Sequence, residues 1–293
     1  MGNRRLGARR LEAVLDNLLN HARLGGLNGS PFTLKDPDRI YLEEYFAQRP
    51  CINADLTSGT DATREPANKN FEVLGNNISS DDVTFAATTG GILLQPDGAN
   101  GDQVIVLPHL DSDQTAWTGT KWGTENQVQW ECAIRTDAAD IDDTTIWAGL
   151  KLTNTPTMAT DDDQAYFIYG AEDDDAGALT TNANLHFVYS VGGTDFVTDL
   201  GTAVAAATDY RLGIQIDSDR KVSAWVNGVQ YGLTTVADAD GVAVSPATGI
   251  ESSLSVALTD DIDLIPYVGI MNQAGTQRDM VLYYEKMSRV FFE

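Results

Sequence analysis

From residue 71 onward, apolar and polar residues alternate in short runs, and this alternation restricts the fold more than any other feature. A period of two places successive side chains on opposite faces of a strand. The runs are bounded by Gly, Asp, Asn or Pro, and no helical pattern comes between them, which predicts one antiparallel β-sandwich of about 220 residues. The expected strands are residues 71–74, 83–87, 92–95, 104–107, 127–136, 145–152, 165–169, 184–190, 194–200, 210–217, 222–226, 229–233, 264–272 and 279–292.

The dipeptide Asn227-Gly228 joins two of these expected strands. Both residue types accept a positive φ, so the dipeptide predicts a tight two-residue hairpin. In the strand that precedes the turn, alternation places Trp225 on the face opposite to Ala224. Trp225 is therefore expected either on the outer surface of its sheet or packed against a second element.

The N-terminal residues follow a different pattern. Residues 5–24 carry apolar side chains at spacings of three and four, which predicts an amphipathic helix. A second helix is expected to begin at Asp36-Pro37, an N-cap acid followed by proline, and to end before Pro50. Isolated helices of this length are marginal in water, so both need a surface to pack on. The expected domains are a helical N-terminal arm (1–50), a linker (51–70) and the sandwich (71–293).

Charge divides the chain at the same place. Residues 1–50 hold eight basic and six acidic side chains, whereas residues 51–293 hold eleven basic and thirty-seven acidic ones. The formal net charge of −24 disfavours binding to nucleic acid and anionic lipid. Cations at a helix start oppose its dipole, so an anionic protein partner explains the arginines there better than helix stability does, with nucleic acid the less favoured alternative. The expected interface residues are Arg4, Arg5, Arg9, Arg10, Leu11, Val14, Leu15, Leu18 and Leu19.

Several classes of protein are excluded by composition. No run reaches eighteen apolar residues, so no membrane-spanning helix is expected. The N-terminus lacks the continuous apolar segment of a secretory signal peptide. Cys51 and Cys132 are too few for a disulfide scaffold or for a zinc site built from cysteines, and two free buried thiols are favoured over one bridge.

Aspartates gather at the ends of the expected strands. A hard cation such as Ca²⁺ needs six to eight oxygen ligands, which acidic loops supply. The alternative is that these runs are solvated loop tips that favour turns. No other cofactor is expected. The best candidate calcium ligands are Asp161, Asp163, Asp173 and Asp175.

Exposed aromatic rings beside polar loops would indicate carbohydrate binding, because an indole offers a flat apolar surface with a polar edge. The candidates are Trp117, Trp122 and Trp225. Trp117 and Trp122 lie in a Gly- and Thr-rich segment and Trp225 lies in the expected hairpin. Packing of each indole in the core or at a contact between subunits is the alternative.

Several of the expected strands resemble those of concanavalin A-like and laminin-G-like domains. Residues 127–135 (QVQWECAIR) and 147–152 (WAGLKL) look like neighbouring sheet strands. Residues 210–217 (YRLGIQID) and 221–228 (KVSAWVNG) resemble the unit of strand, acidic turn and strand ending in Asn-Gly that these domains share. The resemblance covers about residues 71–293. It implies a mainly β protein, a concanavalin A-like antiparallel sandwich (jelly roll) with a short helical arm.

The basic arm MGNRRLGARRL followed by an acidic lectin-like sandwich resembles structural proteins of tailed bacteriophages. This resemblance implies a non-enzymatic capsid decoration or cement protein on the virion surface, which docks onto capsid or other virion proteins through its arm. Homo-oligomerisation is expected, because the arm has nothing to pack on in a monomer. The main alternative is a carbohydrate-binding, lectin-like module of a tail or fibre protein.

A glycan hydrolase of the same fold is the third and least favoured alternative. Sandwich glucanases resemble one another in a Glu-x-Asp-x-Glu strand, and retaining chemistry needs two carboxyl groups about 5 Å apart. Here the only Glu-x-Asp occurs at Glu172-Asp173-Asp174, and no Glu follows at the required spacing. The three histidines, His21, His109 and His186, accompany no Gly-x-Ser-x-Gly motif, so no enzymatic activity is expected.

Overall fold

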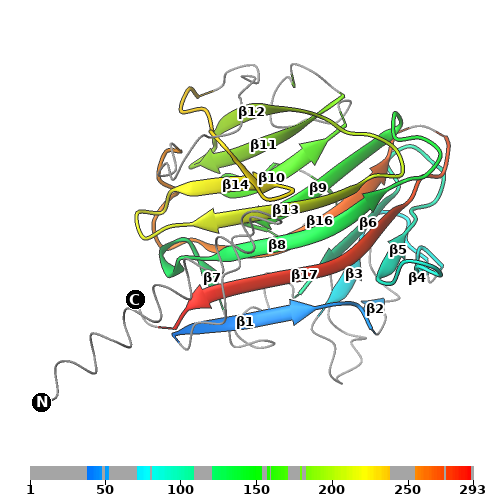
Figure 1. The fold of residues 1–293 in the computed structure, drawn as a ribbon, viewed down its shortest axis with the longest axis horizontal. Helices are drawn as coiled ribbons and strands as arrows, with labels where there is room; N and C mark the ends of the chain where they lie inside the picture. The colour runs from blue at the N-terminus through cyan, green and yellow to red at the C-terminus, as the bar shows by residue number, and fades with distance from the viewer. Residues whose placement is uncertain are drawn as a thin grey trace, which may run out of the picture.

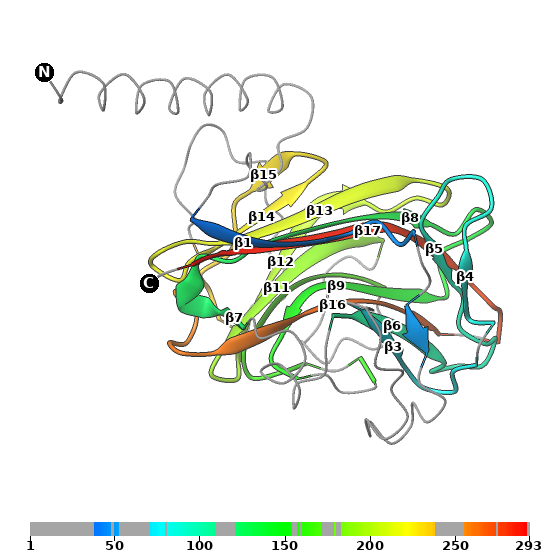
Figure 2. The ribbon, with the colours of Figure 1, turned by 90° about the horizontal axis from the view of Figure 1, so that it is seen from below.

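The computed structural model describes residues 38–47, 50–52, 71–79, 81–108, 121–153, 157–158, 160–170, 179, 183–237, 255–273 and 275–291. These residues form two sheets that pack face to face as the layers of a sandwich (Figures 1 and 2). A search of the same residues for a helix long and apolar enough to cross a membrane finds none.

Sheet A has eight strands in the order β15-β14-β13-β8-β17-β5-β4, and β1 pairs with the free part of β17. The pairing is antiparallel throughout. Its strands are β1 (Arg39–Glu44), β4 (Val83–Phe85), β5 (Ile92–Leu94), β8 (Gln129–Thr136), β13 (Asp209–Ile216), β14 (Val222–Val226), β15 (Val229–Tyr231) and β17 (Met280–Val290).

Sheet B has nine strands in the order β12-β11-β10-β9-β16-β6-β3-β2, and β7 pairs with β16. Among the strands of the described residues, only the short β2–β3 pair is parallel. A 3₁₀ turn, η4 (Thr124–Asn126), follows β7. The strands are β2 (Cys51–Ile52), β3 (Glu72–Leu74), β6 (Gln103–Leu107), β7 (Trp122–Gly123), β9 (Thr144–Lys151), β10 (Gln164–Tyr169), β11 (Asn184–Val191), β12 (Thr194–Ala203) and β16 (Asp263–Asn272).

The predicted antiparallel β-sandwich is confirmed. Each of the fourteen expected strands overlaps an observed one, because the period-two pattern reports which face of a strand is buried. The predicted hairpin is also confirmed, since β14 and β15 pair directly around the turn. Asn227 and Gly228 have φ values of 51° and 83°, the left-handed values that a type I′ turn requires.

The prediction of a second helix is wrong. Residues 39–44 form strand β1, which pairs with β17 over its whole length, from Arg39 opposite Val290 to Glu44 opposite Glu285. Pairing with an open sheet edge satisfies backbone groups and packs the partly buried Leu42 against the core, and this outweighs the capping signal at Asp36-Pro37. The first expected helix and most of the linker lie outside the described residues. The two short strands β2 and β7 were not expected.

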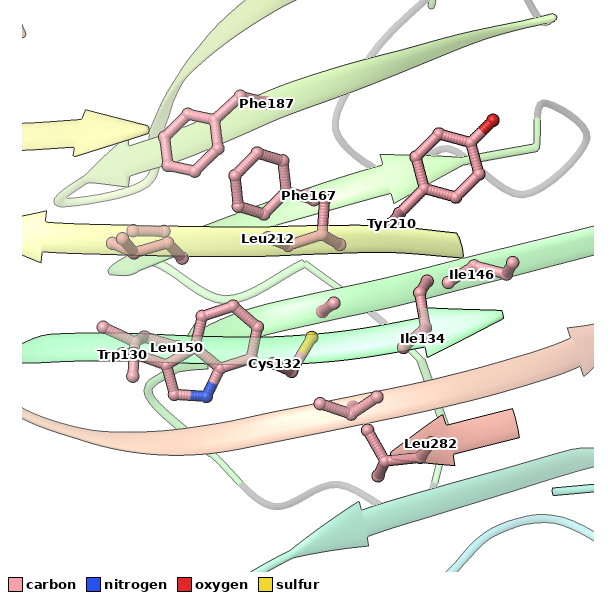
Figure 3. Close-up of a cluster of buried hydrophobic side chains, with 14 of the residues drawn as sticks. Trp130, Cys132, Ile134, Ile146, Leu150, Phe167, Phe187, Tyr210, Leu212 and Leu282 are labelled. Carbon is pink, nitrogen blue, oxygen red and sulfur yellow. The ribbon is translucent and has the colours of Figure 1, made fainter. Parts of the chain in front are cut away.

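The main core fills the space between the sheets (Figure 3). From β8 of sheet A, Trp130, Cys132 and Ile134 point into this core. Phe167 and Phe187 of sheet B belong to the same core and contact each other edge to face, with ring centroids 4.9 Å apart. Cys132 is a buried free thiol. Burial and two nearby carboxyl groups raise its pKa well above the usual range, which makes the thiol unreactive.

One acid lies inside this core. Glu285 of β17 is fully buried opposite Cys132, and its Oε1 accepts a hydrogen bond of 2.7 Å from Trp130 Nε1. Its second oxygen, Oε2, has no hydrogen-bond partner among the described residues. Desolvation raises the pKa of Glu285 to about 8, so the carboxyl group is mostly neutral near pH 7.

Candidate functional site

The outer face of sheet A combines aromatic and charged side chains, most of them partly exposed to solvent, with the buried residues Glu131 and Gly213. Alternation in β8 turns Trp130 and Cys132 into the core and therefore turns Glu131 to the outer face. In β14 the same alternation buries Ala224 and leaves Trp225 partly exposed on the outside. We use "outer face of sheet A" for the surface that these outward side chains form, namely Tyr45, Glu131, Arg211, Gly213, Trp225, Tyr284 and Lys286.

The strand register places five residues of this face in one row across the sheet. Trp225 lies opposite Gly213, Gly213 opposite Glu131, Glu131 opposite Lys286, and Lys286 opposite Glu43. Neighbouring strands lie about 4.8 Å apart, so the row extends over about 19 Å. A second row, next to the first, is Arg211, Ala133 and Tyr284.

Two tyrosines and a lysine form an aromatic cluster at the β17–β1 end of this face. The rings of Tyr45 and Tyr284 lie 5.9 Å apart at an angle of 50°. Lys286 Nζ lies 4.3 Å from the centre of the Tyr284 ring and 5.1 Å from that of Tyr45, within cation–π range. Tyr45 is 53% exposed, so its ring is available to a ligand.

Glu131 links this cluster to the centre of the face. Its Oε1 accepts a hydrogen bond of 2.7 Å from the Tyr284 hydroxyl, and its Oε2 lies 3.9 Å from Arg211 Nε. Burial and the adjacent Glu131 carboxylate raise the pKa of Tyr284 well above its usual range, so the hydroxyl stays protonated and donates. Glu131 is 4% exposed and Arg211 20%, so both present fixed polar edges rather than mobile ends.

A second ionic group borders the face beyond Arg211. Asp209 Oδ1 accepts hydrogen bonds from Arg135 Nη1 at 3.0 Å and from the Tyr283 hydroxyl at 2.9 Å. These contacts join β8, β13 and β17 at the surface. The charges of this region are therefore largely paired with one another, in a molecule whose formal net charge is −24.

The outer face of sheet B has a different character. It carries a second apolar cluster in which Trp147 stacks on Tyr166, with ring centroids 4.3 Å apart and planes 3° from parallel. Lys151 is fully buried beside them, 3.7 Å from Asp161 and 4.8 Å from the centre of the Trp147 ring. Because these side chains are buried, the accessible aromatic surface among the described residues of the two faces is that of sheet A.

The three tryptophans predicted to bind glycans differ in where they lie. Trp225 lies on the outer face of sheet A, in the row that contains Glu131 and Lys286. Trp122 does not fit the prediction, because β7 pairs with β16 and the indole is 1% exposed within the main core. Trp117 lies outside the described residues.

The predicted calcium ligands are not brought together by the described residues. The carboxylate of Asp161 accepts hydrogen bonds from Thr153 N and Oγ1 and pairs with Lys151, whereas Asp163 accepts from Gly192 N. These are internal contacts of loop and sheet, and no group of three metal-ligating side chains occurs among the described residues. Asp173 and Asp175 lie outside them, so a calcium site there stays a prediction.

The predicted capsid interface, Arg4 to Leu19, also lies outside the described residues and stays a prediction. Sequence reasoning missed most of the outer face of sheet A, namely Tyr45, Glu131, Arg211, Tyr284 and Lys286. The signal that was available is alternation within β8 and β17, which separates their outward from their inward residues. The pairing of β8 with β17, which brings Glu131 beside Lys286, is not encoded in either segment alone.

Comparisons with known proteins support the fold. No family model and no curated protein matches the chain. A protein of unknown function from Shewanella oneidensis MR-1 superimposes with a TM-score of 0.51 at 11% identity, covering 89% of this chain and 90% of that one. Peanut lectin matches with a TM-score of 0.46 at 8% identity (87% and 99% covered), and the family-7 alginate lyase A1-II′ with 0.45 at 13% (73% and 86%). The match to the Shewanella protein shows a common β-sandwich fold, and none of these similarities indicates an activity.

Proposed function

We propose that this protein is a non-enzymatic carbohydrate-binding module and that the outer face of sheet A is its binding surface. The observation that supports this proposal best is the alignment of three side chains in one row across the sheet. The partly exposed Trp225 of β14 lies in the same row as Glu131 of β8 and Lys286 of β17. The row ends beside the exposed ring of Tyr45. Aromatic faces with polar edges between them suit a ligand that is apolar on its ring faces and polar around its rim, as a sugar is.

Each part of the surface has a separate role in this proposal. The indole of Trp225 packs against the C–H face of a sugar ring and removes apolar area from water. Glu131 accepts hydrogen bonds from hydroxyl groups, and the planar guanidinium of Arg211 donates to them. Because Glu131 and Arg211 are held by Tyr284 and by each other, little side-chain entropy is lost when a ligand binds.

The same contacts fit a binding role for Glu131. It is the carboxylate nearest the centre of the surface, and its two oxygens contact the Tyr284 hydroxyl and Arg211. Held between these partners, the carboxylate is suited to accept hydrogen bonds from a ligand.

The test is to titrate the full chain with a panel of oligosaccharides and to measure binding by tryptophan fluorescence and calorimetry. Trp225→Ala is expected to weaken binding of the best ligand by about tenfold or more. Phe85→Ala is the matched control, because Phe85 is 55% exposed on β4 at the opposite edge of the sheet. The proposal fails if no saccharide binds or if Trp225→Ala binds as tightly as the parent protein while its circular dichroism is unchanged.

A further inference from the structure

We propose that the ligand is an uncharged oligosaccharide that lies across the strands of sheet A, from Trp225 to Tyr45, and contacts the protein through at least two separate sugar residues. This inference rests on the proposed function and adds to it the length, direction and charge of the ligand. It is carried by the positions of the aromatic rings, by the small residues between them and by the pairing of the charges.

The length follows from the register. Trp225 on β14 and Tyr284 on β17 are separated by three strand intervals, about 14 Å, and Tyr45 lies beyond Tyr284 on the β1 side. This separation is larger than a single sugar ring. One ring stacked on Trp225 therefore leaves Tyr45 free for another ring of the same chain.

The direction follows from what lies between the two aromatic contacts. Gly213, opposite Trp225, has no side chain, and Ala133, opposite Tyr284, has only a methyl group. Gly213 is buried, and the Glu131 carboxylate lies between Tyr284 and Arg211, which flank Ala133, so the surface between the rings is polar and carries no bulky apolar side chain. Glu131 and Arg211 stand on the same two strands, so polar groups line the path of a chain that crosses the strands.

The charge of the ligand follows from the ion pairs. Arg211 pairs with Glu131, Arg135 pairs with Asp209, and Lys286 lies against the rings of Tyr284 and Tyr45. An anionic sugar would have to compete with carboxylates that already hold the two arginines. It would also approach a molecule with a formal net charge of −24, whereas a neutral sugar experiences neither penalty.

The experiment compares disaccharides with hexasaccharides of glucose, mannose and xylose, and with hexamers of uronic acids and sulfated sugars. We expect a neutral hexasaccharide to bind about tenfold or more tighter than the disaccharide of the same sugar. Tyr45→Ala should weaken binding of the hexasaccharide more than binding of the disaccharide, whereas Trp225→Ala should weaken both, and Phe85→Ala should change neither. Affinity for the neutral hexasaccharide should be the same at low salt and at about 0.5 M NaCl.

Three outcomes overturn the inference and leave the proposed function standing. They are equal affinity for the disaccharide and hexasaccharide, an equal effect of Tyr45→Ala on both, and tighter, salt-sensitive binding of an anionic hexamer. If no saccharide of either charge binds, the proposed function fails and the inference fails with it. Circular dichroism of each variant shows whether its fold is retained.

Discussion

Glu285 is an acid at a position where the alternation of β17 calls for an apolar side chain. Its neighbours are the Trp130 indole, which donates to it, the Cys132 thiol opposite, and Glu44 opposite on β1. This buried environment stabilises the charged carboxylate less than water does, so the pKa of Glu285 rises to about 8. An ordinary glutamate titrates near 4.3, so near pH 7 the group is mostly neutral in the folded chain and ionised in the unfolded chain.

This difference makes stability depend on pH. Unfolding releases a proton from Glu285 between these two pKa values, so its contribution to stability is complete below about pH 4.5 and is lost as pH rises through about 8. Glu285→Gln should therefore raise the free energy of unfolding near pH 7 by about 2 kcal/mol and flatten its pH dependence. Urea unfolding from about pH 5 to 9 measures both, with Glu125→Gln, at a partly exposed position, as the control. An unchanged slope in Glu285→Gln would contradict this account.

At the scale of elements, the strands were predictable because the alternation of apolar and polar residues within each strand indicates which of its faces is buried. The hairpin at Asn227-Gly228 was predictable for a similar reason, since its turn chemistry lies in two adjacent residues. Strand β1 was not, because Asp36-Pro37 is a sound helix start and six residues of β1 are too few to establish a period of two. What decides its structure is the edge of β17, which lies more than 200 positions further along the chain.

An arginine joins two acidic loops at one end of the sandwich. Arg278 Nη2 lies 3.1 Å from Asp140 Oδ2 and 3.8 Å from Asp143 Oδ2, and Asp137 Oδ2 accepts from Asp279 N at 2.9 Å. These contacts join the loop between β8 and β9 to the loop between β16 and β17. Burial and the nearby Asp137 raise the pKa of Asp279, as expected when carboxylates are crowded.

Arg278→Gln should lower the free energy of unfolding by about 1 to 2 kcal/mol near pH 7, because the carboxylates then lose their counter-charge. Millimolar Ca²⁺ should recover part of this loss in the variant, since a divalent cation can neutralise the same oxygens. Lys121→Gln, which removes an exposed ion pair with Asp263, is the control. Thermal unfolding with Ca²⁺ and with a chelator measures the effect, and equal losses in the two variants would argue against it.

At the scale of the whole molecule, the binding surface depends on register and so was only partly predictable. The exposure of Trp225 follows from its own hairpin. Its alignment with Glu131 and Lys286 requires β14, β13, β8 and β17 to pair in one order, and these strands come from distant parts of the sequence. No local pattern contains that order. One residue of the candidate site, Trp225, was therefore predicted from the sequence, and the other residues of the site became evident only from the fold.

The large negative charge should make stability sensitive to salt. At low ionic strength, like charges repel over distances comparable to the size of a domain, and this repulsion opposes the compact state. Raising NaCl from about 20 to about 300 mM should raise the thermal midpoint by several degrees near pH 7.5. The same salt change near the calculated isoelectric point of 4.2 should have little effect, because the net charge there is close to zero. An equal rise at both pH values would rule out repulsion as the cause.

Across the β1–β17 pair, Arg39 Nε donates a hydrogen bond to Ser288 Oγ, and these two residues are 249 positions apart in the sequence. A ribosome that adds about 5 to 20 residues per second delivers β1 roughly 10 to 50 seconds before its partner. During that interval the nascent polypeptide exposes strands that no later segment has yet covered. Chaperone supply during translation, rather than the stability of the finished sandwich, should therefore limit the soluble yield.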